Sequence, residues 1–278
     1  MQYQASLEAL IHPERGAPLF GQSLPWNKDS ICAELSRLAY IRFEAGDRAR
    51  LTEALARGGF GEPVCFFHPG ADAQGFAASR ADGSAWLAYR GTEPDRLRSI
   101  VSDLRFLPED WPGGGRVHRG FAAAERSLAA DVDAWVAGLG EAPLVVTGHS
   151  LGAAMATLTA ARFAQAELVT FGSPRVGNAQ FRRGFEGRQV RRYVDCRDIV
   201  EDLPPPGLFV HLDGERYIDR LGNVRPTAPG TMARIADQLR ANWDYRRCIG
   251  PGNAPARELA DHAPINYVSA TLGARQGP

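Results

Sequence analysis

The sequence has no excess of charge of either sign and no apolar run long enough to cross a membrane. Its 32 lysine and arginine residues balance 32 aspartate and glutamate residues, so no bulk electrostatic field favours nucleic acid or an anionic membrane. No stretch approaches the roughly 20 consecutive apolar residues that a membrane-spanning helix needs. We therefore expect no nucleic-acid partner and no transmembrane segment.

Paired cysteines and a secretory leader are also missing. The four cysteines form no Cys-x-x-Cys motif, which favours reduced, partly buried thiols over a disulfide framework. Residues 1–22 carry Glu8, His12, Glu14 and Arg15 and lack the apolar core of a Sec signal peptide. The expected location is therefore the cytoplasm, or outside the cell after export by a leaderless route.

No internal repeat or linker interrupts the 278 residues, so we expect a single domain over residues 1–278. Apolar periodicity predicts helices over 30–55, 121–137, 151–164, 231–247 and 265–272, and strands at 63–67, 75–79, 85–89, 143–147, 168–171 and 190–194. A hairpin is expected near 209–224. Strands that alternate with helices are typical of a largely parallel sheet with crossover helices. The expected fold class is therefore α/β.

The segment Gly-His-Ser-Leu-Gly at 148–152 is a candidate for nucleophilic chemistry. It follows an expected strand and opens an expected helix, the setting in which a serine projects from a sharp turn at the edge of a sheet. Ser150 is therefore the candidate nucleophile. The same turn places the N–H of Leu151 at the N-terminus of a helix, where free donors and the helix dipole favour an oxyanion. A glycine-rich helix start with a serine near its N-cap is the alternative.

A serine nucleophile needs a base, and the sequence has only six histidines. The order serine, acid, histidine that is typical of this strand–turn–helix motif leaves His211 and His262. His211 lies in an apolar, strand-like run at 208–212 that favours a packed, hydrogen-bonded side chain. His262 lies in a polar segment at 260–264, the kind of mobile loop from which a base can reach a nucleophile, and is the better candidate.

The acid of such a triad should lie between Ser150 and His262, just beyond the end of a strand. Asp198 follows the strand expected to end near Val194. Asp195 and Asp202 lie close by, and acidic residues in loops are normally solvated turn formers. Spacing alone therefore leaves Asp198 only slightly ahead of its two neighbours.

Several motifs resemble the class 3 lipase family, which includes fungal triacylglycerol lipases and feruloyl esterases. They are YRGT at 89–92, VHRGF at 117–121, VTGHSLGAA at 146–154, TFGSPRVG at 170–177, RDIV at 197–200 and LPP at 203–205. The resemblance covers residues 85–270 in order and leaves the first 60 residues unmatched. One departure is Gly-Ala-Ala at 152–154 where many members have Gly-Gly-Ala.

The resemblance implies an α/β-hydrolase fold with a helical lid, and lipid-ester hydrolysis through an acyl-enzyme. It assigns Ser150 as nucleophile, Asp198 as acid in preference to Asp195, and His262 as base. Thr92 is implied to complete an oxyanion hole with the N–H of Leu151. Neither a metal nor another cofactor is expected.

The segment at 93–106 is the expected lid. Its apolar residues recur at i, i+3, i+4 and i+7, which predicts an amphipathic helix; they are Leu97, Ile100, Val101 and Leu104. Such a lid would meet a lipid interface when open. The same pattern is also consistent with an ordinary surface helix packed on the core.

Three other functions remain open at this point. A short-chain or feruloyl-type esterase would keep a more polar, fixed flap. A phospholipase-type antibacterial effector would account for a leaderless chain. A catalytically dead hydrolase fold used as a binding protein is disfavoured by the intact set of Ser150, Asp198 and His262.

Overall fold

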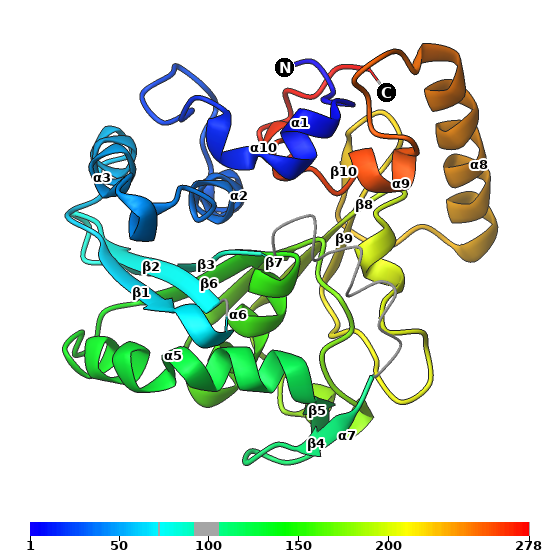
Figure 1. The fold of residues 1–278 in the computed structure, drawn as a ribbon. Coiled ribbons are helices and arrows are strands. Elements are labelled where there is room, and N and C mark those ends of the chain that lie inside the picture. Colours follow the sequence, from blue (N-terminus) through cyan, green and yellow to red (C-terminus); the bar gives the residue numbers. More distant parts are fainter. Residues whose placement is uncertain (72, 92–105, 278) are drawn as a thin grey trace.

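The computed structural model describes residues 1–71, 73–91 and 106–277 (Figure 1). Within these residues, eight strands form one twisted sheet in the order β1-β2-β3-β6-β7-β8-β9-β10. They are β1 (Val64–His68), β2 (Ala73–Ser79), β3 (Ala85–Tyr89), β6 (Leu144–His149), β7 (Glu167–Phe171), β8 (Val190–Asp195), β9 (Glu215–Ile218) and β10 (Val224–Arg225). The strands from β3 to β9 are parallel, and the pairs β1–β2, β2–β3 and β9–β10 are antiparallel. The expected mostly parallel sheet is therefore confirmed.

Helices cover both faces of this sheet (Figure 1). One face carries α2 (Lys28–Leu38) and α10 (Pro264–Thr271), and the other carries α5 (Arg119–Ala137) and α6 (Leu151–Arg162). Successive strand residues point to opposite faces, so Trp86 and Val145 join the core under α2, while Leu87 and Val146 join the core under α6. Burial on both faces explains why the central strands are continuously apolar rather than alternating.

The remaining elements surround this three-layer body. The helices are α1 (Leu7–Ile11), α3 (Arg48–Arg57), α7 (Ala179–Arg183), α8 (Thr231–Cys248) and α9 (Arg257–Ala260), and β4 (Pro108–Asp110) pairs with β5 (Arg116–His118). Short 3-10 turns lie at η1 (Pro13–Arg15), η2 (Phe43–Ala45), η3 (Pro69–Ala71) and η4 (Ile199–Asp202). The two ends of the chain lie side by side, because the N–H of Tyr3 donates to the carbonyl of Gln276 over 3.0 Å.

Two local expectations are wrong. The helix expected over 30–55 is divided into α2, η2 and α3. Helix α2 ends at Leu38, and the chain turns again at Gly46, whose φ of 109° lies in the left-handed region. The run at 208–212 is not a strand; it forms only isolated bridges at Phe209 and Val210. Apolar side chains there are buried by the turns around them rather than by a ladder of backbone hydrogen bonds.

Among the described residues, no helix has both the length and the apolar character needed to cross a membrane. All four cysteines are described and free; Cys32 and Cys196 are buried, Cys65 is half-buried and Cys248 is exposed. The expected lid residues Leu97, Ile100, Val101 and Leu104 lie outside the described residues, as does Thr92.

Candidate active site

Ser150 occupies a sharp turn between the central strand β6 and helix α6. Its φ of 60° and ψ of −127° make it the one described residue other than glycine with a positive φ. A Cβ atom at Gly148 would lie 2.2 Å from the carbonyl oxygen of Gly152, and one at Gly152 would lie 2.3 Å from that of Tyr89. Glycine is therefore required at both positions for strand, turn and helix to approach this closely. A positive φ is strained for a residue that has a side chain, and strained residues of this kind cluster at functional sites.

Asp198 and His262 meet although 64 positions separate them in the sequence. The Nδ1 atom of His262 lies 2.7 Å from Oδ2 and 2.9 Å from Oδ1 of Asp198. A carboxylate oxygen accepts, so Nδ1 carries the proton and Nε2 is left as a free acceptor. Both side chains are buried, although His262 lies in the short connection between α9 and α10.

Two polar atoms at this place have no hydrogen-bond partner among the described residues. They are Oγ of Ser150 and Nε2 of His262. Ser150 directly follows His149, whose ring centroid lies 4.4 Å from that of His262, so the two orphaned atoms belong to one neighbourhood. Buried polar atoms are nearly always paired, and an exception is typical of a site that acts on a ligand. The hydrogen bond between a nucleophile and its base is often long without substrate and shortens in the substrate complex.

Asp198 is held by donors other than His262. The phenol of Tyr267 donates to Oδ2 over 2.5 Å, and the N–H of Val200 donates to Oδ1 over 2.8 Å. Burial, together with the adjacent Asp198 carboxylate, raises the pKa of Tyr267 well above its ordinary value, so the phenol keeps the proton that it donates. These bonds fix the orientation of the carboxylate.

Gly172, at the end of β7, leaves room for this pair. Its φ is 54°, and a Cβ atom there would lie 2.5 Å from Oδ2 of Asp198 and 3.0 Å from Nδ1 of His262. Any side chain at this position would therefore displace the carboxylate or the imidazole. The motif at 170–177 thus has a steric function at the site.

His149 supports the backbone of the loop that carries His262. Its Nε2 lies 2.9 Å from the carbonyl oxygen of His262, and its Nδ1 lies 2.8 Å from the hydroxyl of Tyr40. Since a carbonyl can only accept, Nε2 donates and Nδ1 accepts from the phenol. Complete burial, reinforced by His262, lowers the pKa of His149 well below its ordinary value, so this ring stays neutral and acts as a fixed support.

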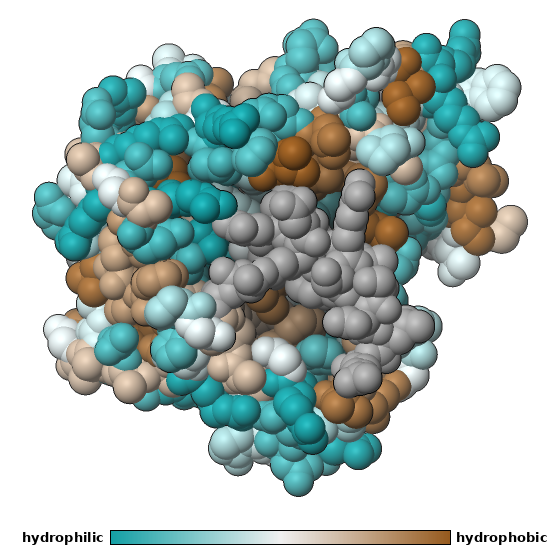
Figure 2. Space-filling model, viewed as in Figure 1, coloured by the Kyte–Doolittle hydropathy of each residue, from teal (hydrophilic) through white to brown (hydrophobic). Residues whose placement is uncertain are grey.

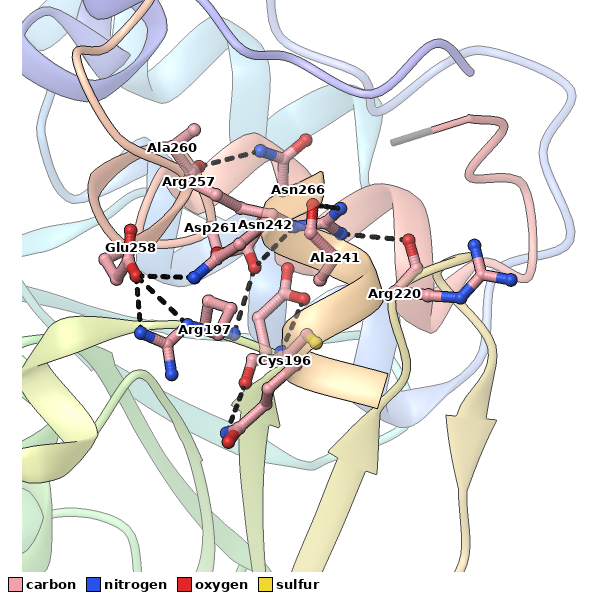
Figure 3. Close-up of polar contacts among 12 residues, drawn as sticks. Cys196, Arg197, Arg220, Ala241, Asn242, Arg257, Glu258, Ala260, Asp261 and Asn266 are labelled. Atoms are coloured by element: carbon pink, nitrogen blue, oxygen red, sulfur yellow. Dashed lines mark hydrogen bonds and ion pairs between the residues drawn. The ribbon is translucent and has the colours of Figure 1, made fainter. Parts of the chain in front are cut away.

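A single buried carboxylate joins the loop that carries Asp198 to the loop that carries His262. Asp261 immediately precedes His262, and its Oδ2 accepts from the N–H of Arg197, the residue before Asp198, over 3.0 Å. The same oxygen accepts from Nε of Arg257 over 3.1 Å (Figure 3), and Oδ1 accepts from the phenol of Tyr3 over 2.6 Å. Asp261 is fully buried. One side chain therefore sets the spacing between the two loops.

The other candidates for acid and base that the sequence offered lie away from the Asp198–His262 pair. Asp195 accepts from Nη1 of Arg275 over 2.5 Å inside the core, and Asp202 is exposed at the end of η4. His211 is bound through Nε2 to the carbonyl oxygen of Glu201 over 2.8 Å, so it is the packed, hydrogen-bonded side chain that was expected. None of the three contacts His262 or Ser150.

Tyr267, Asp261, His149 and Tyr40 were not recognised from the sequence as parts of this site. Two of them adjoin candidate residues in the chain, which is the only signal that could have drawn attention to them; the other two come together with the site only in three dimensions. The described residues hold no cluster of histidine, cysteine, aspartate and glutamate that could bind a metal ion.

Of the two donors expected for an oxyanion, the structure describes the N–H of Leu151, which lies in the first turn of α6, where amides have no partner within the helix. It adjoins Ser150 directly. Thr92, the second expected donor, follows the buried Gly91, where a Cβ atom would lie 3.0 Å from Cβ of Ser150. The chain therefore passes close to Ser150 just before Thr92.

Comparison with known proteins agrees with this architecture. Residues 86–208 match the family model described as Lipase (class 3). The lipase of Rhizomucor miehei is 34% identical over 159 residues, an alignment that covers 51% of this chain and 43% of the relative. A chloroplastic phospholipase A(1) of Arabidopsis thaliana is 33% identical over 230 residues, covering 68% of this chain and 51% of the relative. The matched part of the chain thus spans about half or less of these curated relatives.

A solved structure of Rhizomucor miehei triacylglyceride lipase superposes with a TM-score of 0.56 at 26% identity, covering 68% of this chain and 78% of the other. The parallel sheet, its two helical layers and the strained serine turn define an α/β-hydrolase fold. Within that fold, residues 86–208 match the class 3 lipase family, and the relatives of this chain are lipases and phospholipases.

Proposed function

We propose that this protein is a serine carboxylic-ester hydrolase that acts on lipid esters through an acyl-enzyme on Ser150. The observation that carries the proposal is the buried Asp198–His262 pair, whose free Nε2 lies in the same neighbourhood as the unpartnered Oγ of Ser150. A serine becomes nucleophilic when an adjacent base takes its proton. A histidine with Nδ1 bound to a carboxylate has the tautomer that this step needs.

The proposed reaction has two halves. In the first, Oγ of Ser150 attacks the ester carbonyl, its proton passes to Nε2 of His262, and the N–H of Leu151 stabilises the oxyanion together with Thr92. Collapse of the intermediate expels the alcohol, which takes the proton from His262. In the second half, water gives its proton to His262 and attacks the acyl-enzyme. When this second intermediate collapses, His262 returns the proton to Oγ of Ser150 and the acid product leaves. Asp198 orients the imidazole and stabilises its cation in both halves.

Two comparisons support lipid esters as the substrates. The relatives include a fungal lipase and a plant phospholipase A(1), so triacylglycerols and glycerophospholipids are both candidates. The proposed lid at 93–106, with Leu97, Ile100, Val101 and Leu104 on its apolar face, would open at a lipid surface. A panel of p-nitrophenyl esters, emulsified triacylglycerols and phospholipid vesicles would separate these classes, and a rate that rises above the solubility limit of the ester would support the lid.

Covalent labelling tests the proposal directly. A fluorophosphonate probe should label the wild-type chain and should not label Ser150→Ala, which should also lose hydrolysis of p-nitrophenyl butyrate. Ser269→Ala is the matched control, because Ser269 is buried and its hydroxyl is bound to the carbonyl oxygen of Asn266. Labelling of Ser150→Ala, or equal loss in both variants, would contradict the assignment.

A further inference from the structure

The outer face of α8 carries a row of exposed apolar side chains. Met232, Ile235, Leu239 and Trp243 are 78%, 44%, 66% and 65% exposed. Spacings of three, four and four residues place them along one side of the helix. A surface helix normally turns its apolar side toward the core, whereas the apolar row on α8 faces away from it. A row of this size on the surface is typical of an interaction site.

The charges on α8 are divided between its two sides. Arg240, Arg246 and Arg247 are exposed. At 100° per residue, Arg240 and Arg247 lie along one edge of the apolar row, and Arg246 continues the row beyond Trp243. None of them forms an ion pair with another described residue. The two acidic residues of the helix lie on its inner side, where Asp237 and Asp244 contact Arg220 at 3.7 and 2.7 Å. The outward side is therefore apolar and cationic without a compensating carboxylate from the helix.

We propose that this side of α8 binds an anionic lipid surface. The inference rests on the proposed function only in that acidic glycerophospholipids are both lipid esters and the components of such a surface. An apolar row that includes a tryptophan, with arginines along its edge and at its end, is typical of helices that lie in the interface plane of a bilayer. The arginines complement anionic headgroups, which is the charge argument for lipid over an apolar protein groove. Figure 2 shows hydrophobic side chains over α8 at the outer edge of the molecule.

The inner side of α8 is bonded to both loops of the active site. The amide of Gln238 donates to the carbonyl oxygen of Cys196, two residues before Asp198, over 2.9 Å. Arg257 donates through Nη1 to the carbonyl oxygen of Ala241 over 3.2 Å (Figure 3). A lipid surface bound by α8 would therefore be held at a fixed distance from the nucleophile, which would raise the effective concentration of substrate there.

Sedimentation with vesicles tests this proposal independently of any hydrolysis. The wild-type chain would be mixed with vesicles of ether-linked phosphatidylcholine and phosphatidylglycerol, which an esterase cannot cleave. The variant Leu239→Gln/Trp243→Gln should bind about tenfold more weakly, because it loses two apolar side chains from the interface. Val64→Gln/Phe67→Gln, which changes two exposed apolar residues of β1, is the matched control and should bind like the wild type.

The charge argument has its own variant. Arg240→Gln/Arg247→Gln should weaken binding to vesicles with phosphatidylglycerol and leave binding to pure phosphatidylcholine unchanged. Equal binding by the Leu239/Trp243 variant and the wild type would overturn the proposal. The proposal would also be overturned if the wild-type chain were a dimer in gel filtration and this variant a monomer. The face would then bind a second copy of the chain. Hydrolysis of monomeric p-nitrophenyl butyrate should be the same in the three double variants as in the wild type. Failure of the proposed function would be seen separately, as activity that remains in Ser150→Ala.

Discussion

Asp198 binds the imidazole of His262 through both carboxylate oxygens, at 2.7 and 2.9 Å from Nδ1. The pair is enclosed, and Tyr267 and Val200 donate to the same carboxylate. Its orientation is thus set by the fold before any substrate arrives, which is the form of organisation that favours transition-state stabilisation.

Asp198→Asn tests whether this carboxylate orients the base. An amide can present its NH₂ group to Nδ1 and stabilise the wrong tautomer, so we expect kcat to fall by about 10³- to 10⁴-fold with little change in KM. Steady-state hydrolysis of p-nitrophenyl butyrate measures both constants. Asp202→Asn, at an exposed position in the adjacent turn, should retain the wild-type rate; similar losses in both variants would speak against the assignment.

Gly172→Ala should remove activity by steric displacement. The new methyl group would lie 2.5 Å from Oδ2 of Asp198, so the carboxylate must move away from His262. Gly187→Ala is a matched control, because Gly187 also has a positive φ but nothing within 4 Å of the added Cβ. We expect both variants to lose about 1 kcal/mol of stability from backbone strain, whereas only Gly172→Ala should lose most of its kcat. An active Gly172→Ala enzyme would show that the site tolerates the shift.

Asp261→Asn should separate the loops that carry Asp198 and His262. It removes a fully buried charge opposite Arg257, a change that typically costs about 3 kcal/mol or more. We expect a fall of that order in the free energy of unfolding in urea, with a lowered kcat in the protein that remains folded. Glu258→Gln, which breaks a partly exposed pair with Arg197, should cost about 1 kcal/mol or less. Equal losses of unfolding free energy in the two variants would mean that the burial of Asp261 does not contribute to stability.

His211 should make the protein sensitive to acid. Burial, with further repulsion from Arg192 and Arg175, lowers the pKa of His211 to about 2, while in the unfolded chain it is about 6.5. Between these values the unfolded state binds the proton and the folded state does not, so stability falls as pH falls below about 6.5, by up to about 1.4 kcal/mol per pH unit.

The variant His211→Gln isolates this effect. At about pH 7.5 it should be less stable than the wild type by about 1 kcal/mol, because a buried hydrogen bond to Glu201 is altered. At about pH 4.5 the difference should vanish or reverse, because only the wild type carries the acid penalty. Urea titrations at both pH values measure it, with His68→Gln, at an exposed position, as the control. A constant difference would exclude His211 as the titrating group.

Local patterns were sufficient for most of the sheet and helices. Apolar runs predicted the buried strands β3, β6 and β7, and the alanine- and leucine-rich segment after Ser150 predicted α6. The end of α2 at Leu38 was missed, because apolar residues at helical spacing continue up to Ile41. The turn at Gly46 was missed, because no pattern shows that this glycine adopts a left-handed conformation. The run at 208–212 was misread, because short apolar segments are buried in turns as well as in strands.

The sequence by itself determined that Ser150 lies in a strand–turn–helix motif, because glycines at 148 and 152 permit the close approach that this turn needs. It also determined the candidates for acid and base, by chain order and family motifs. Only the tertiary structure decided that Asp198, and neither Asp195 nor Asp202, contacts His262, since strand β8 and the loop before α10 meet through residues 64 positions apart. Only the fold, too, could place Tyr267, His149 and Asp261 around that pair, because hydrogen bonds between distant segments leave no periodic trace in a sequence.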